Sequence, residues 1–251
     1  MARRRSPAPN GPLVRQAHAI LADSSRTLAR LERVAARSVA AAAEALITCF
    51  EGGGTVFLCG NGGSAADAQH FACELAGRFT RERMALPAVA LSTNTSSLTA
   101  IANDYGYDQV FARQLEGLGT PGDVLVAITT SGRSPSVSRT VHVAYRLGMI
   151  VIGLTGQRGK RFAASCDHAL VSPSDSTPRI QEAHIAMAHA LCELVERSMF
   201  GGSARRRARP VRSASRRKGA SRNRARPAAP SARSVARRAP RRAPAKRKAR
   251  R

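Results

Sequence analysis

Several features of membrane and exported proteins are missing from this 251-residue sequence. It has no uninterrupted apolar run of the length needed to cross a bilayer, which is about 18–20 residues. Its basic start is followed by Ser-Pro-Ala-Pro-Asn-Gly-Pro, where a signal peptide would have an apolar core. We therefore expect no membrane contact and no signal peptide.

The sequence also lacks any Cys-x-x-Cys pair, the usual mark of a structural zinc site. Its cysteines are odd in number, widely spaced and set in apolar segments, at Cys49, Cys59, Cys73, Cys166 and Cys192. Such cysteines are typical of reduced core thiols. We therefore expect a cytoplasmic protein without disulfides.

Acidic residues are absent from the end of the chain, where the positive charge is concentrated. The formal net charge is +25, yet residues 201–251 hold 21 Lys and Arg, no acid and no aromatic residue. Residues 11–200 hold 17 basic and 16 acidic residues, as an ordinary globular domain does. Few large apolar side chains flank the charges at either end, so little burial could offset the entropy of ordering them. We predict a disordered basic N-terminus (1–11), a folded domain (12–200) and a disordered basic tail (201–251).

Within the folded domain, short apolar runs alternate with helical patterns. Residues 12–50 have helical spacing and read as one long helix or two, ended by Gly52, Gly53 and Gly54. Strands are predicted at 55–60, 87–92, 123–130, 149–156 and 168–173, with helices at 64–79, 107–119, 134–148 and 177–200. Strands without polar alternation, separated by helices, indicate a parallel sheet covered on both faces. The predicted fold class is α/β, a three-layer sandwich.

Two polar loops follow predicted strands, where ligands bind in open parallel sheets. One contains Gly60-Asn61-Gly62-Gly63-Ser64, and the other is Thr-Thr-Ser-Gly-Arg-Ser-Pro-Ser at 129–136. Hydroxyls beside a glycine and a helix N-terminus suit a phosphate group, although they could simply cap the helix. The first loop is not Gly-x-Gly-x-x-Gly, and no acid is well placed for a dinucleotide ribose, so we do not expect a nicotinamide cofactor.

Two helices carry a second polar set. His70 and Glu74 lie four residues apart and share a helix face directly after the glycine loop. Gln181 and His189 are eight residues apart, about 80° around a helix of about 3.6 residues per turn, so both could reach one pocket. These side chains could bind a divalent metal or act as acid–base catalysts. Each alone could equally be a surface polar residue or a core histidine.

Four separated motifs, in order, resemble the phosphoheptose isomerase family within the SIS (sugar isomerase) domain superfamily. They are CGNGGSAADAQHFACELAGRF, IANDYGYD, ITTSGRS and TPRIQEAHIAMAHALCELVE, and the resemblance runs from about residue 15 to 200. It implies a SIS-type sandwich and a homotetramer with active sites at subunit interfaces. It also implies isomerisation of sedoheptulose 7-phosphate to D-glycero-D-manno-heptose 7-phosphate, an early step toward the heptose of lipopolysaccharide or related glycans.

The resemblance also implies roles for individual residues. It implies one zinc ion per subunit, with the ligand set His70, Glu74, Gln181 and His189. The substrate-binding residues would be Asn61, Gly62, Gly63, Ser64, Glu74, Asn103, Asp104, Thr129, Thr130, Ser131, Ser134 and Gln181, with Arg78 near the ligand. We expect Glu74 to move the carbon proton and His189 to act at the oxygens. Whether Glu74 is base, metal ligand or both stays open.

The sequence departs from the family pattern at two positions. Pro178 stands where some members have an aspartate, and Arg133 stands where asparagine is frequent.

Two other functions are compatible with this fold. Relatives of the same fold bind replication-initiation proteins instead of isomerising sugars, and the basic tail could bind DNA nonspecifically. Those relatives tend to lack the carboxylate that Glu74 supplies here. A sugar-phosphate sensor of a transcriptional regulator is weaker, because no helix-turn-helix segment is evident.

Overall fold

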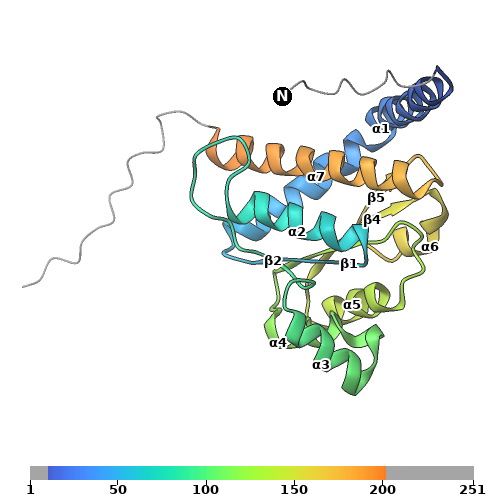
Figure 1. Ribbon diagram of the computed structural model, residues 1–251. Helices are drawn as coiled ribbons and strands as arrows, with labels where there is room; N and C mark the ends of the chain where they lie inside the picture. Colours follow the sequence, from blue (N-terminus) through green and yellow to red (C-terminus); the bar gives the residue numbers. More distant parts are fainter. Residues whose placement is uncertain (1–10, 202–251) are drawn as a thin grey trace, which may run out of the picture. The chain divides into compact units, whose positions relative to one another are not determined.

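The computed structural model describes residues 11–201 and contains one five-stranded parallel sheet (Figure 1). The strand order is β2-β1-β3-β4-β5. The strands are β1 (Val56–Gly60), β2 (Ala88–Ala90), β3 (Val124–Ile128), β4 (Ile150–Gly156) and β5 (His168–Ser172). Each lies within a predicted strand, and the predicted fold class is confirmed.

Helices cover both faces of this sheet (Figure 1). One face is covered by α1 (Gly11–Glu51), α2 (Gly63–Ala76) and α7 (Thr177–Phe200). The other is covered by α3 (Thr95–Tyr105), α4 (Ala112–Leu118), α5 (Pro135–Arg146) and the short α6 (Lys160–Ala163). Two 3₁₀ turns, η1 (Tyr107–Gln109) and η2 (Gln157–Gly159), complete the described elements.

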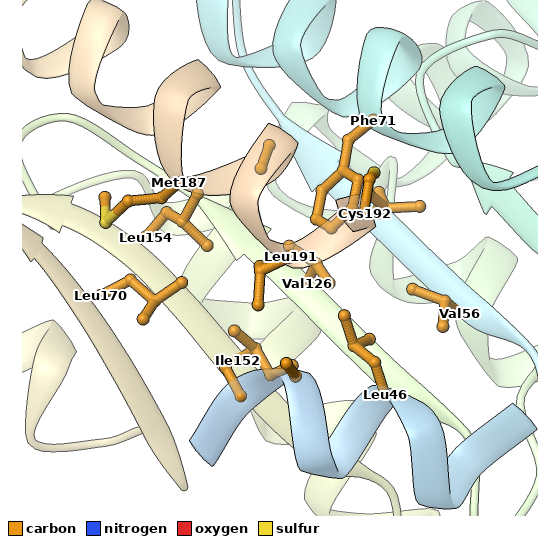
Figure 2. Packing of buried hydrophobic residues seen from close by; sticks show 14 of the residues in the cluster. Leu46, Val56, Phe71, Val126, Ile152, Leu154, Leu170, Met187, Leu191 and Cys192 are labelled. Carbon is orange, nitrogen blue, oxygen red and sulfur yellow. The ribbon is translucent and has the colours of Figure 1, made fainter. Parts of the chain in front are cut away.

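The strands are apolar on both faces because each face has its own core. In β1, Val56 and Leu58 pack toward α1, α2 and α7, whereas Phe57 and Cys59 pack toward the other helices. Successive side chains of a strand point to opposite faces, so a strand between two cores has no polar face. Figure 2 shows the first core, where Leu46, Phe71 and Leu191 from three helices meet the sheet.

All five cysteines are free thiols, and Cys49, Cys59 and Cys192 are buried, as predicted for core thiols. Cys166 is half-buried, and the prediction is wrong for Cys73, which is exposed on α2. Burial raises the pKa of Cys59 to about 12 and that of Cys166 to about 11, which keeps both protonated at neutral pH. Among residues 11–201, no helix is long and apolar enough to cross a membrane.

The first predicted helical region, expected to be one long helix or two, is one continuous helix. It starts at Gly11, which was predicted to belong to the disordered N-terminus (1–11), and the region 107–119 divides into η1 and α4. Helix α3 was not predicted, because no residue of it is fully buried and its apolar pattern is limited to Leu98, Ile101 and Ala102, which pack partly buried against the second core. Its start is fixed locally, where the Asn94 side chain accepts a hydrogen bond from the Ser97 amide at 3.0 Å. The basic segments 1–10 and 202–251, predicted to be disordered, lie outside the described residues.

The strand order brings the two predicted ligand loops together. The chain moves from β1 outward to β2 and then returns to β3 on the other side of β1. Ligands in open α/β sheets bind at the carboxyl ends of the strands where the order reverses in this way. The β1–α2 and β3–α5 loops both lie at this point.

Candidate active site

Asn61 joins the two loops. Its side-chain amide donates to Ser134 Oγ at 2.7 Å and to Ser136 Oγ at 3.0 Å, across the β1–β3 boundary. Its carbonyl oxygen accepts a hydrogen bond from the Tyr107 hydroxyl at 2.9 Å. Three side chains from two other segments therefore fix the orientation of this one amide at the switch point.

The β3–α5 loop has the form of an anion site. Ser134 occupies the N-cap position of α5, but its side chain makes no capping hydrogen bond and instead accepts one from Asn61. Thr129 is buried and accepts a hydrogen bond from the Gly132 amide at 3.2 Å, at a glycine with a φ of 66°. The helix N-terminus adds a partial positive charge. The loop is thus shaped by its hydroxyls and does more than cap the helix.

Gln181 lies against the β1–α2 loop. A Cβ atom added to Gly63 would collide with the Gln181 side-chain amide, so the glycine allows the start of α7 to approach the start of α2. The preceding Gly62 has a φ of 56°, which favours glycine at that corner. Gln181 therefore reaches the loop predicted to hold the substrate.

Further along these helices, His70, Glu74 and His189 come together. His70 Nε2 is 3.1 Å from Glu74 Oε1 and 3.5 Å from His189 Nε2, with the two imidazole ring centres 5.1 Å apart. The side chain of His70 is 44% exposed and that of Glu74 is 22% exposed. A titratable trio open to solvent behind two polar loops can exchange protons with a bound ligand.

The spacing of these donors suits a metal ion. Zn–N bonds of about 2.0–2.1 Å place tetrahedral ligands about 3.3–3.4 Å apart, close to both separations at His70. The Nε2 atoms of His70 and His189 face each other, and they can form a hydrogen bond only if one of them carries a hydrogen atom. A metal cation, by contrast, could bind the lone pairs of both nitrogens. Across residues 11–201, however, no group of three or more His, Cys, Asp or Glu side chains forms a preformed metal cluster. The zinc ligand set therefore stays a prediction.

Among the four predicted zinc ligands, Gln181 lies away from the other three. Eight residues separate it from His189, which corresponds to about 12 Å of helical rise. It contacts the start of α2, whereas His70 lies two turns further along that helix.

Three other predicted residues face elsewhere in the described chain. Asn103 and Asp104 are exposed at the end of α3, where the Asn103 amide donates to Asp104 Oδ1 at 2.8 Å. Arg78 is 61% exposed and lies 3.8 Å from Glu82. Within residues 11–201, these hydrogen-bond and ion-pair contacts do not involve the histidine cluster.

Sequence reasoning missed several residues that support the site. Tyr107 and Ser136 orient Asn61, and both lie within or beside the motif segments. Phe79 packs against His189 with ring centres 5.4 Å apart. Asp67 has an unpaired buried oxygen, and burial raises the pKa of its carboxyl group. The positions of Tyr107 and Asp67 inside the motifs were the available signal.

His184 illustrates the core-histidine alternative. It is 1% exposed, neither ring nitrogen has a hydrogen-bond partner, and burial lowers its pKa to about 4. It is therefore a neutral core residue at neutral pH, and its side chain is distinct from the exposed trio.

The fold and the site together define an α/β sandwich protein in which two polar loops meet at the switch point of the sheet and a His-Glu-His cluster lies on the helices beside them. The family model for the SIS domain matches residues 21–156. The phosphoheptose isomerase of Trichlorobacter lovleyi is 49% identical over 181 residues, which cover 72% of this chain and 92% of that protein. That of Bradyrhizobium sp. (strain ORS 278) is 51% identical, covering 70% and 91%. The chain belongs to the phosphoheptose isomerase family of SIS-domain proteins.

Solved structures agree with this assignment. The phosphoheptose isomerase of Neisseria gonorrhoeae is 45% identical, with a TM-score of 0.70 over 73% of this chain and 98% of that chain. That of Francisella tularensis is 37% identical, with a TM-score of 0.71 and the same coverage. The likeness thus extends over almost the whole length of both solved chains.

Proposed function

We propose that this chain isomerises sedoheptulose 7-phosphate to D-glycero-D-manno-heptose 7-phosphate. The observation that carries the proposal is the juxtaposition of Glu74 and His189 around His70 in a member of this family. A carboxylate and an imidazole are the two groups that a ketose-to-aldose conversion requires.

The reaction moves one proton between C1 and C2 and another between their oxygens, through an enediol. Glu74 takes the carbon-bound proton from one carbon and returns it to the other. His189 exchanges the proton between the two oxygens. Its ring is held by contacts with His70 and Phe79, which limits how far the imidazole can turn.

The phosphate of the substrate binds at the β3–α5 loop. The supporting features are the hydroxyls of Thr130, Ser131 and Ser134 and the N-terminus of α5. The exposed Arg133 adds positive charge beside them. Asn61, from the neighbouring β1–α2 loop, and Gln181, from α7, contact the sugar hydroxyls. Gly62, Gly63 and Ser64 complete that loop.

His70, His189 and Glu74 would hold one zinc ion per subunit. When bound, zinc polarises a carbonyl and stabilises negative charge on oxygen. The position of Gln181 beside Gly63 favours a contact with substrate over ligation of the metal. Because His70 has no other assigned task, it is the residue whose loss tests the metal site most directly.

We further propose that the chain assembles as a homotetramer. The support comes from exposed apolar residues of α1, in which burial begins only at Thr27. Its apolar residues Ile20, Leu21 and Val34 are 57%, 69% and 61% exposed, as expected of a surface that a second copy covers. Analytical ultracentrifugation should give a single species of four chains. A monomer at micromolar concentration would contradict the proposal.

One assay tests the proposed activity. Purified full-length protein, loaded with zinc, is incubated with sedoheptulose 7-phosphate, and the product is identified by NMR. Appearance of D-glycero-D-manno-heptose 7-phosphate is expected. If no product forms while the protein still binds the sugar phosphate, the non-catalytic alternative is correct.

The basic tail supports a separate proposal, nonspecific DNA binding by residues 202–251. Positive charge without acids or aromatics favours phosphate contacts without base readout. Affinity for random duplex DNA should fall with salt, with a logarithmic slope of about −0.9 per phosphate contact. A chain ending at Gly202 should lose this binding and keep isomerase activity. Equal DNA affinity of the two proteins would disprove the role of the tail.

A further inference from the structure

A buried ion pair lies beside the candidate site but has no role in the chemistry proposed above. Arg83 Nε donates to Glu196 Oε1 at 2.9 Å, and each side chain is 1% exposed. Buried ion pairs are a poor means of stabilising a fold, since apolar side chains of similar volume often do as well. The many other partners of this pair suggest a different role.

Glu196, near the end of α7, binds the loop that follows α2. Its carboxylate accepts the backbone amides of Phe79, Thr80 and Arg81 at 2.9, 2.9 and 3.0 Å. The Thr80 hydroxyl adds a fourth bond at 3.0 Å. These bonds lower the pKa of Glu196 to about 2 despite its burial, so the carboxylate stays charged. Three consecutive amides around one carboxylate leave this loop little freedom.

Arg83 binds the end of α2 itself. Its guanidinium donates to the carbonyl oxygens of Glu74 and Leu75 at 2.8 and 2.9 Å, and to those of Gly77 and Met84 at 3.3 and 3.0 Å. The last carbonyls of a helix have no partner within the helix and attract a positive charge. Arg83 therefore holds the backbone of the residue whose carboxylate is the proposed base.

The loop bound by Glu196 also reaches the other proposed catalytic group. Phe79 donates its amide to Glu196, and its ring packs 5.4 Å from that of His189 at an interplanar angle of 37°. His189 and Glu196 lie two turns apart on α7. One ion pair thus contacts both halves of the catalytic cluster, Glu74 through its carbonyl and His189 through Phe79.

We propose that Arg83 and Glu196 are positioning residues for the isomerisation, and that they set the geometry between Glu74 and His189. The inference rests on the proposed function, because it assigns the pair to that reaction. Both side chains are 1% exposed, so they are not accessible to a bound sugar phosphate. Small displacements of acid–base groups lower the rate steeply, so the pair should affect turnover more than substrate affinity.

The test compares Glu196→Gln with Asp123→Asn. Asp123 is also a buried carboxylate, 4% exposed, and it accepts the Thr55 and Thr120 amides at the opposite edge of the sheet. Both variants lose a buried charge that binds backbone amides, so both should lower the melting temperature. Each is assayed on sedoheptulose 7-phosphate as a full-length, zinc-loaded protein, below its melting temperature.

Glu196→Gln should lower kcat at least tenfold. It should change KM less than about threefold, because the proposed phosphate-binding loop lies between β3 and α5 and is not bound by Glu196. Asp123→Asn should keep both constants within about twofold of the parent. Arg83→Lys, which retains the charge but not the planar fork, should also lower kcat. An unchanged kcat in folded Glu196→Gln, or an equal loss in Asp123→Asn, overturns the inference.

If the parent protein proves inactive on sedoheptulose 7-phosphate, crystal structures of the parent and of Glu196→Gln test whether the ion pair positions Glu74 and His189. A wider Phe79–His189 ring separation or a shifted Glu74 in the variant keeps the positioning role and refutes only the proposed substrate. Unchanged positions of both groups refute the positioning role, whatever the activity of the parent.

Discussion

The two edges of the same parallel sheet use their polar residues in opposite ways. At the amino edge, Asp123 accepts the Thr55 amide at 2.8 Å and both the amide and hydroxyl of Thr120, at 2.7 and 2.9 Å. At the carboxyl edge, Asn61 and Ser134 hydrogen-bond across two loops. Along α2, which starts at that edge, His70 and Glu74 remain partly exposed and contact each other and His189. The amino edge stabilises the fold, whereas the carboxyl edge and the helix that starts there keep polar groups accessible to a ligand.

Because the two edges differ in this way, we expect substitutions at one edge to change stability and substitutions at the other to change activity. Substitutions at the amino edge should change the free energy of unfolding and leave turnover alone. Substitutions of the exposed groups at the carboxyl edge should do the reverse. The pair Arg83 and Glu196 should affect both, because its bonds stabilise a loop that also contacts the catalytic cluster.

The largest effect is expected for Glu74→Gln. The amide keeps the size of the side chain but cannot accept the carbon-bound proton, so kcat should fall by about 10²–10⁴-fold. The melting temperature should change little, since the side chain is not part of the core. Steady-state kinetics and thermal denaturation measure the two. Turnover within about threefold of the parent would eliminate Glu74 as the base.

Removal of the histidines should have the next largest effect, through the metal. His70→Ala and His189→Ala should each lower the zinc content measured by elemental analysis, because each deletes one of two facing nitrogens. His142→Ala is the matched control, since His142 is exposed on α5 and remote from the cluster in sequence. Stoichiometric zinc in both cluster variants would rule out this site.

Acid should affect the stability of the protein in two separate steps. Burial lowers the pKa of His184 from 6.5 to about 4, so the unfolded chain binds a proton there more readily and stability falls as the pH drops from 6.5 to 4. The Glu196 carboxylate has its pKa lowered from 4.5 to about 2, so its contribution is present above pH 4.5 and is lost between 4.5 and 2. Each step should be about 3 kcal/mol, from about 1.4 kcal/mol per pKa unit.

Denaturant titrations at several pH values can separate these steps. His184→Leu should abolish the upper step, because leucine has no group that binds a proton in this pH range. Glu196→Gln should abolish the lower step only. If either variant keeps the full acid dependence of the parent, the corresponding assignment is incorrect.

The sequence predicted the strands of this fold well because each lies between two cores and is apolar throughout. It missed α3, a Ser- and Thr-rich helix whose apolar pattern is limited to the partly buried Leu98, Ile101 and Ala102. In the site, the four-residue spacing of His70 and Glu74 was sufficient to pair them on one helix. The contact of Phe79 with His189 was not predictable, since it depends on a loop held by a residue more than 100 positions away.

The smallest predicted effect concerns substrate affinity at the carboxyl edge. Ser134 supplies a hydroxyl at the start of α5, already oriented by the Asn61 amide at 2.7 Å. Loss of one hydrogen bond to a charged phosphate costs about 1.5–3 kcal/mol, so Ser134→Ala should raise KM at least tenfold with little change in kcat. Ser138→Ala is the matched control, an exposed serine one turn further along α5. A KM that stays at the parent value in Ser134→Ala would place the phosphate outside the β3–α5 loop.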